Sequence, residues 1–80
     1  MTDTILRLPT VKTNTGLSRS TIYLRVAQGE FSKPVSLGGR AVGWPASEVA
    51  ALNAARIAGK SNAEIRDLVV TLEAARKTVA

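Results

Sequence analysis

The sequence lacks cysteine and histidine altogether among its 80 residues. Without them the chain cannot form a disulfide, a zinc finger, a thiolate nucleophile or an imidazole base. Aromatic side chains are also scarce, with one Trp, one Tyr and one Phe. We therefore predict that the protein is not an enzyme and that it uses no metal or cofactor.

Long apolar runs are missing as well. The longest uncharged apolar stretch falls far short of the roughly 20 residues that a membrane-spanning helix needs. Residues 1–4 show neither the basic nor the apolar character of a signal peptide. We expect a cytoplasmic, nucleoid-associated protein without a membrane partner. Because so small a domain has a thin core and little room for a deep pocket, a surface that binds another macromolecule is favoured.

Positive charge is in excess and unevenly placed. Eleven Lys and Arg stand against six Asp and Glu, for a net charge of +5. Residues 1–40 hold six basic and two acidic residues, and residues 41–80 hold five and four. A polyanion such as DNA is attracted to the N-terminal half and releases condensed counterions on binding. An ordinary solvated surface explains the same charge, so charge alone does not decide.

Two short helices separated by a glycine turn are predicted in this basic half. Pro9 suits the first turn of a helix over residues 9–15, and Gly16 favours the left-handed conformation that ends it. Ser18 is a good N-cap for a second helix over residues 19–28. Helix, glycine turn and helix in this order are typical of a helix-turn-helix. The apolar residues expected to pack the two helices together are Val11, Leu17, Ile22 and Val26.

A β-hairpin is predicted next. Apolar side chains alternate in residues 35–37 and again in residues 42–44, which is the period of a strand with one buried face. Gly38 and Gly39 supply the positive φ angles of a two-residue turn. A lone hairpin is marginally stable in water, so it must lean on the helices. We expect Trp44 to make that contact from the core.

Two further helices are predicted in the C-terminal half. Pro45 starts a helix that ends before Gly59, and a capping box over residues 61–64 starts a last helix over residues 62–78. Its amphipathic stripe can cap the hairpin domain or bind another copy, and we favour self-association on DNA. The residues assigned to self-association are Ile65, Leu68, Val69 and Leu72.

Candidate DNA contacts lie on the second helix and at the hairpin tip. A recognition helix presents its N-terminal residues to base edges in the major groove, where Arg19 can bond guanine or a phosphate. Tyr23 can pack its ring and reach a phosphate with its hydroxyl. Arg40 can lie along a phosphate strand or enter a narrow minor groove, while Arg7 and Lys12 are weaker candidates. The predicted DNA-binding residues are Ser18, Arg19, Ser20, Thr21, Tyr23, Leu24, Arg25, Lys33, Gly39 and Arg40.

A series of short motifs runs in register through about residues 5–59. The motifs are Arg7-Leu8-Pro9, residues 15–23 (TGLSRSTIY), residues 31–35 (FSKPV), residues 37–44 (LGGRAVGW) and Ser47-Glu48-Val49. This series resembles the AlpA family of small DNA-binding proteins from phages and mobile elements. The resemblance implies a MerR-type winged helix-turn-helix, mainly α with a small β-hairpin, here followed by an extra C-terminal helix. It also implies DNA contacts through residues 18–28 and through the wing around residues 38–40.

Two departures from the family pattern bear on these expectations. The family usually follows Ile-Tyr with Arg and then Leu, whereas this chain has Leu24 and then Arg25. Leu24 then points toward solvent or DNA, and Arg25 either lies toward the core or extends outward along its stem. Which of the two touches DNA stays open. The last helix is also longer than the family pattern.

The resemblance implies a sequence-specific duplex DNA-binding protein of a mobile element. It would act as an excisionase, also called a recombination directionality factor, or as a transcriptional regulator, with several copies bound and an integrase as a candidate partner. The alternative is a protein–protein adaptor that uses the last helix and binds DNA only incidentally. We expect a loose terminus at residues 1–4, a winged helix-turn-helix at residues 5–59 and an amphipathic helix at residues 60–80.

Overall fold

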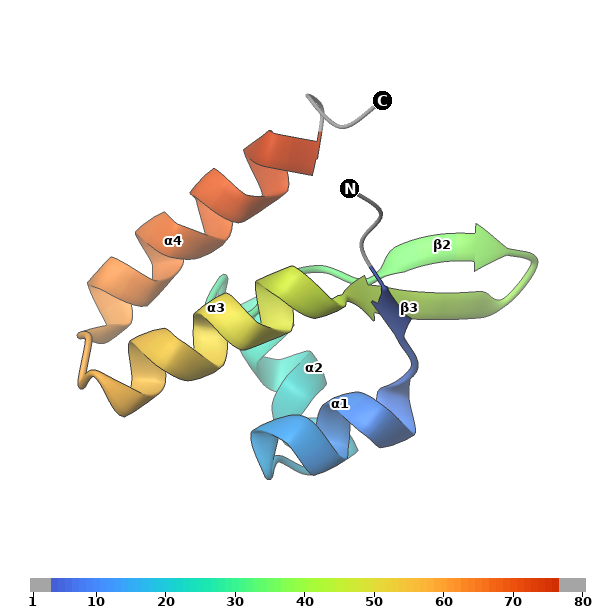
Figure 1. The fold of residues 1–80 in the computed structure, drawn as a ribbon, viewed down its shortest axis with the longest axis horizontal. Helices are drawn as coiled ribbons and strands as arrows, with labels where there is room; N and C mark the ends of the chain where they lie inside the picture. Colours follow the sequence, from blue (N-terminus) through green and yellow to red (C-terminus); the bar gives the residue numbers. More distant parts are fainter. Residues whose placement is uncertain (1–3, 77–80) are drawn as a thin grey trace.

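A computed structural model describes residues 4–76. Its elements are β1 (Ile5–Leu6), α1 (Leu8–Thr15), α2 (Arg19–Ala27), β2 (Val35–Gly38), β3 (Ala41–Pro45), α3 (Ala46–Ile57) and α4 (Asn62–Ala75). The β2–β3 hairpin projects at one end of the molecule, and the turn between α3 and α4 lies at the other end (Figure 1). The arrangement is a winged helix-turn-helix followed by a further helix, which confirms the predicted fold class.

The helix ends form where their capping residues predict them. Ser18 accepts a hydrogen bond from the Thr21 backbone N–H at the start of α2, at 3.2 Å. Ser61 and Glu64 complete a reciprocal capping box at the start of α4. Gly16 takes the left-handed conformation after α1, with φ of 72°. The last helix ends at Ala75, and residues 77 and 78, which were expected to extend it, lie outside the described residues.

The sheet has one strand more than the sequence predicts. Its order is β1-β3-β2, and β1 pairs antiparallel with β3 through Leu6 and Trp44. Gly43 allows β1 to approach β3 this closely, because a Cβ at Gly43 would collide with Ile5 and lie 2.9 Å from the Leu6 carbonyl oxygen. A two-residue strand is too short to show alternation, but a glycine inside a strand is a signal of close backbone approach.

Two local expectations need correction. Gly38 pairs with Ala41, so the hairpin loop consists of Gly39 and Arg40, one residue later than expected. A register irregularity between Ser36 and Gly38 accounts for the shift, since a bulge adds one residue to one strand. Thr4, expected in a loose terminus, accepts a hydrogen bond from the Ala46 N–H at 2.7 Å. Residues 1–3 lie outside the described residues.

The core is built around Trp44, as predicted. This residue is fully buried, and its indole N–H donates to the Ser32 carbonyl at 2.9 Å. Its ring meets Tyr23 of α2 and Phe31 edge-on, with centroids 6.1 Å and 6.3 Å away. The buried apolar residues are Val11, Ile22, Phe31, Trp44, Val49, Leu52, Ile65 and Val69.

The apolar stripe of α4 belongs to this same core. Ile65 is 1% exposed and Val69 is 4% exposed, while Leu68 and Leu72 are half-buried against the cluster. The expectation that these side chains form a free self-association or adaptor surface is therefore wrong for Ile65 and Val69. The physical reason is the thin core of so small a domain, which α4 completes. Within residues 4–76, no helix combines the length and apolar content needed to cross a bilayer.

Candidate nucleic-acid interface

Helix α2 is held by one apolar edge and exposes the rest of its surface. Ile22 is fully buried and Val26 packs beside it, which leaves the opposite side open. Ser18, Arg19 and Ser20 are exposed at its N-terminus. The Ser18 hydroxyl donates to Thr21 Oγ1 at 2.9 Å and lies 3.2 Å from Ser20 Oγ. These hydroxyls form an exposed polar cluster that can exchange hydrogen bonds with a phosphate.

Arg19, Tyr23 and the core residue Trp44 contact one another in succession. The Arg19 guanidinium carbon lies 5.9 Å from the centre of the Tyr23 ring, within cation–π range. The Tyr23 ring packs in turn on Trp44 of β3. Tyr23 remains 37% exposed, so it both packs and reaches solvent. These contacts orient the Arg19 charge and connect α2 to β3, one of the two strands of the wing.

The neighbouring pair on α2 divides between the two sides of the helix. Leu24 is 56% exposed on the outer face. Arg25 is half-buried and lines a hollow between α2 and α3 together with Leu17, Glu30 and Leu52. Of the two, Leu24 therefore lies on the exposed face of α2 and Arg25 on the side toward α3.

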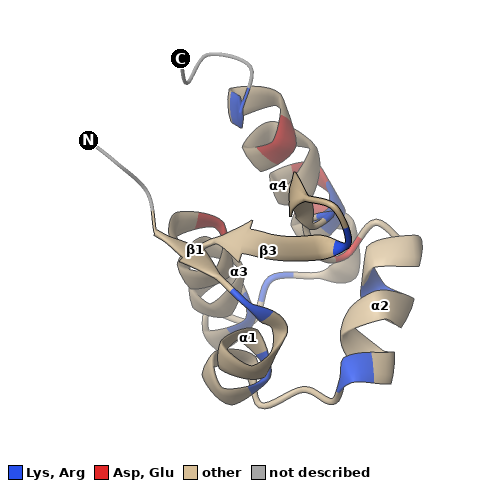
Figure 2. Ribbon diagram, turned by 90° about the vertical axis from the view of Figure 1, so that its right-hand side faces the viewer, with Lys and Arg blue, Asp and Glu red and all other residues tan. Residues whose placement is uncertain are grey.

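The wing carries the remaining predicted residues. Gly39 and Arg40 form the exposed loop, with φ of 55° at Gly39. Nothing lies within 4 Å of where a Gly39 side chain would begin, so a phosphate can approach the backbone there. Lys33 precedes β2 and its side chain is exposed. Figure 2, which faces the tip of the hairpin, shows basic segments on α1, on α2 and at the wing.

The basic residues of the described chain form two groups. Four of them lie on or next to α3 and α4, and each pairs with a carboxylate at an N–O distance of 2.6 to 3.9 Å: Arg56, Lys60, Arg66 and Arg76. The other six form no ion pair with any carboxylate of residues 4–76: Arg7, Lys12, Arg19, Arg25, Lys33 and Arg40. We call these six the unpaired cations. They all lie on α1, on α2, beside these helices or at the wing.

Comparison with known proteins places this region in a family. A family model described as "Prophage CP4-57 regulatory protein (AlpA)" matches residues 4–57, from β1 to the end of α3. The chain belongs to the AlpA family. "Uncharacterized protein ORF88" of Enterobacteria phage P4 is 56% identical over 55 residues, which are 69% of this chain and 62% of the phage protein. The chain thus spans less than two thirds of that relative. No solved structure matches.

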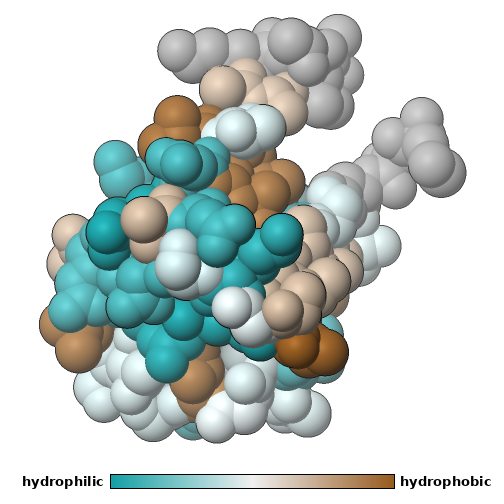
Figure 3. All heavy atoms as spheres, turned by 90° about the vertical axis from the view of Figure 1, so that its left-hand side faces the viewer, coloured by the Kyte–Doolittle hydropathy of each residue, from teal (hydrophilic) through white to brown (hydrophobic). Residues whose placement is uncertain are grey.

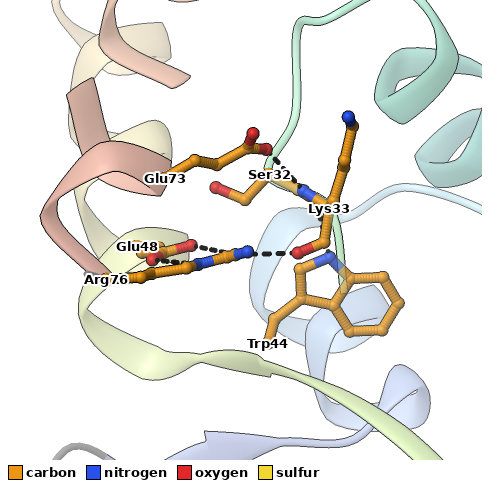
Figure 4. Close-up of polar contacts among 6 residues, drawn as sticks. All are labelled: Ser32, Lys33, Trp44, Glu48, Glu73 and Arg76. Carbon is orange, nitrogen blue, oxygen red and sulfur yellow. Dashed lines mark hydrogen bonds and ion pairs between the residues drawn. The ribbon is translucent and has the colours of Figure 1, made fainter. Parts of the chain in front are cut away.

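Helix α4 lies beyond the AlpA match and makes contacts that the sequence did not reveal (Figure 4). Arg76 donates to both carboxylate oxygens of Glu48, at 2.6 Å and 2.8 Å, and to the Lys33 carbonyl at 2.7 Å. The Lys33 N–H donates to Glu73 at 2.9 Å. The bond to Glu48, which is buried, raises the pKa of Arg76 above its ordinary value.

This cluster joins AlpA-family residues to a helix far along the chain. Glu48 and Arg76 are 28 residues apart, so no local pattern marks them as partners. The Lys33 side chain itself points away from the Glu48–Arg76 pair (Figure 4). The Lys33 backbone is thus held by Glu73 and Arg76, while its ammonium group forms no ion pair with a carboxylate of residues 4–76. No group of three or more potential metal-ligating side chains occurs within residues 4–76.

Proposed function

We propose that this AlpA-family protein is a sequence-specific duplex DNA-binding regulator of a mobile element. The supporting observation is the separation of its charges, with the unpaired cations on α1, α2 and the wing and the paired ones around α3 and α4. A surface of unpaired cations favours a polyanion, whose condensed counterions are released on binding. In this proposal α2 enters the major groove and the wing lies against the neighbouring backbone.

The exposed face of α2 supplies the base contacts. Arg19, steadied by the Tyr23 ring, bonds a guanine edge or a phosphate at the start of the helix. Leu24, on the outer face, offers an apolar contact for a thymine methyl group. The hydroxyls of Ser18, Ser20 and Thr21, together with the free N–H groups of the helix N-terminus, bind phosphate.

The wing supplies backbone contacts. Arg40 extends from the exposed loop toward a phosphate strand or a narrow minor groove. Lys33 adds a second charge at the base of the wing, and Gly39 lets a phosphate approach the main chain. Arg7 and Lys12, both exposed on or beside α1, extend the electrostatic footprint.

Two biological uses fit this one surface. As an excisionase-like factor, several copies would bind an attachment site and steer an integrase toward excision. As a transcriptional regulator, the protein would bind a promoter of its element. Fold and surface do not distinguish these uses. Contacts between copies would have to use residues other than Ile65 and Val69, which the core occupies.

Footprinting of the purified full chain over its own element's attachment site and nearby promoters tests the proposal. Binding to the protected duplex is then titrated over a range of salt. With about five or six phosphate contacts, log K should fall with log salt with a slope of roughly −5. Lys60→Ala removes one paired charge at the α3–α4 turn and should leave the slope unchanged. Absence of a footprint, or a slope near zero, contradicts the proposal.

A junction assay for excision separates the two uses. With the integrase present, loss of this protein should reduce excision of the element if the attachment site is protected. If only a promoter is protected, its transcript should change instead while excision at constant integrase level does not.

A further inference from the structure

We propose that α4 is a brace that fixes the wing relative to α2, with Glu73 and Arg76 as positioning residues for DNA binding. The proposal rests on the proposed function. It starts from residues 28–34, which connect α2 to β2. Together with the Tyr23–Trp44 contact, this connection sets how the wing lies beside α2. Helix α4 holds it at two places.

The first anchor is at Glu30, just after α2. Arg66 of α4 donates to its carboxylate at 2.9 Å, and Arg56 of α3 lies 3.7 Å from the other oxygen. The Glu30 side chain is only 13% exposed, which limits screening by water. The Arg66 stem also covers Gly29, where an added Cβ would lie 3.8 Å from Arg66 Cδ. This anchor fixes the chain as it leaves α2.

The second anchor is at Lys33, just before β2. Its N–H donates to Glu73, and its carbonyl accepts from Arg76, so both backbone groups of one residue are held by α4. Arg76 also binds Glu48 in the first turn of α3, directly after β3. One guanidinium therefore joins the chain that enters the hairpin to the chain that leaves it (Figure 4).

The geometry makes α4 a rigid spacer between the two anchors. Arg66, Glu73 and Arg76 follow a spacing of seven and then three residues, which places them on one side of a helix. Arg66 and Glu73 are thus separated by about 10 Å of regular helix, and Arg76 follows directly after the last residue of α4. Pro34 alone separates Lys33 from β2. The Arg40 end of the wing lies about 20 Å beyond Lys33, so a tilt of about 10° moves it by about 3 Å, enough to break a hydrogen bond.

A double-mutant cycle with the wing loop tests this role. Arg76→Gln should weaken binding to the protected duplex by about three- to tenfold, whereas the charge-matched Lys60→Gln should leave affinity within about twofold. In an Arg40→Ala background, Arg76→Gln should have a clearly smaller effect, because the main wing contact that it positions is already lost. Equal losses in both backgrounds would mean direct phosphate contact or general destabilisation, and would overturn the proposal.

A second variant covers the case in which Arg76→Gln fails to fold. Glu73→Ala removes the partner of the Lys33 N–H at an exposed position, and Asp67→Ala removes the same charge from α4 elsewhere. Amide hydrogen exchange should accelerate at Lys33 and in the wing for Glu73→Ala only, with α3 unchanged. Affinity for the duplex should fall relative to Asp67→Ala.

The outcomes separate the brace from the function on which it rests. A wild-type chain without salt-sensitive duplex binding refutes the proposed function, and hydrogen exchange still reports whether α4 holds the wing. A wild-type chain that binds while folded Glu73→Ala binds as tightly as Asp67→Ala, with unchanged exchange at Lys33, refutes the brace alone.

Discussion

The two sides of this molecule carry similar numbers of basic residues and use them differently. Around α1, α2 and the wing, the cations have no carboxylate partner among residues 4–76, whereas around α3 and α4 each described cation has one. Figure 3 views the side that carries the α3–α4 turn and shows a largely hydrophilic surface. The two sides therefore differ in whether their cations are paired. The placement of Glu30, Glu48 and Glu64 determines which of the described cations form ion pairs.

The ion pairs around α3 and α4 differ in burial: Glu48–Arg76 is largely buried, whereas Glu64–Lys60 is exposed. Breaking the buried pair should have the largest effect on stability. Arg76→Ala leaves Glu48, which is 5% exposed, as a buried charge without its partner. We expect a loss of about 3 kcal/mol in the free energy of unfolding, because a broken buried pair leaves an uncompensated charge. Lys60→Ala breaks an exposed pair and should cost less than about 1 kcal/mol. Urea denaturation measures both, and equal midpoints would contradict the distinction.

Arg19→Ala tests the unpaired side where base contact is expected. Affinity for the protected duplex should fall by about 1–3 kcal/mol, with a smaller loss on random DNA, if Arg19 meets a base edge. Stability should hardly change, since the side chain is exposed. The control is Lys60→Ala, which removes the same charge from the α3–α4 turn, away from α2 and the wing. Equal losses on both DNAs would reduce Arg19 to a phosphate contact.

Arg40→Ala tests the wing loop, and its effect on specificity should be smaller than that of Arg19→Ala. We expect weaker binding across all sequences and a salt slope that is shallower by about one unit, as loss of one phosphate contact predicts. Titrations at several salt concentrations on protected and random duplexes measure this. A slope equal to that of the wild type would remove the wing loop from the interface.

Glu64→Gln has the smallest expected effect and depends on pH. Hydrogen bonds from the Ser61 backbone N–H and from the Ser61 side chain lower the pKa of Glu64, so its ionised form stabilises the start of α4. This stabilisation is complete above the ordinary carboxyl pKa and is lost as the pH falls through the lowered value. The urea midpoints of wild type and Glu64→Gln should therefore differ at neutral pH and converge in acid, once the pH has fallen below the lowered pKa of Glu64. A gap that persists in acid would contradict this assignment.

Local chemistry explains which parts of the fold were predictable. Caps at Ser18 and Ser61 and the glycine after α1 gave helix boundaries to within a residue or two, because each acts on its own neighbours. The alternation of apolar side chains in residues 42–44 predicted that Trp44 is buried. The hairpin loop was displaced by one residue because a bulge depends on cross-strand pairing. Strand β1 was missed because two residues carry no period.

The candidate site was predictable in the same uneven way. Exposure on α2 follows from which residues face the core, so the exposure of Arg19 and Ser20 was predictable from spacing. Their contact with DNA stays a prediction. The partition between Leu24 and Arg25 needed the position of α3. The amphipathic pattern of α4 indicated a buried face without indicating its partner. The Glu48–Arg76 contact joins distant positions and left no mark in either local segment.

The alternation of anchoring and outward residues along α2 has a consequence for divergence among related regulators. Ile22, Val26 and the Tyr23 ring hold the helix in place, while Leu24 is exposed and Ser20 contacts only the neighbouring Ser18 hydroxyl with its side chain. Outward residues can therefore be exchanged without loss of stability. In the proposed mode of DNA binding, substitution at these two positions changes the target preference and leaves the fold intact.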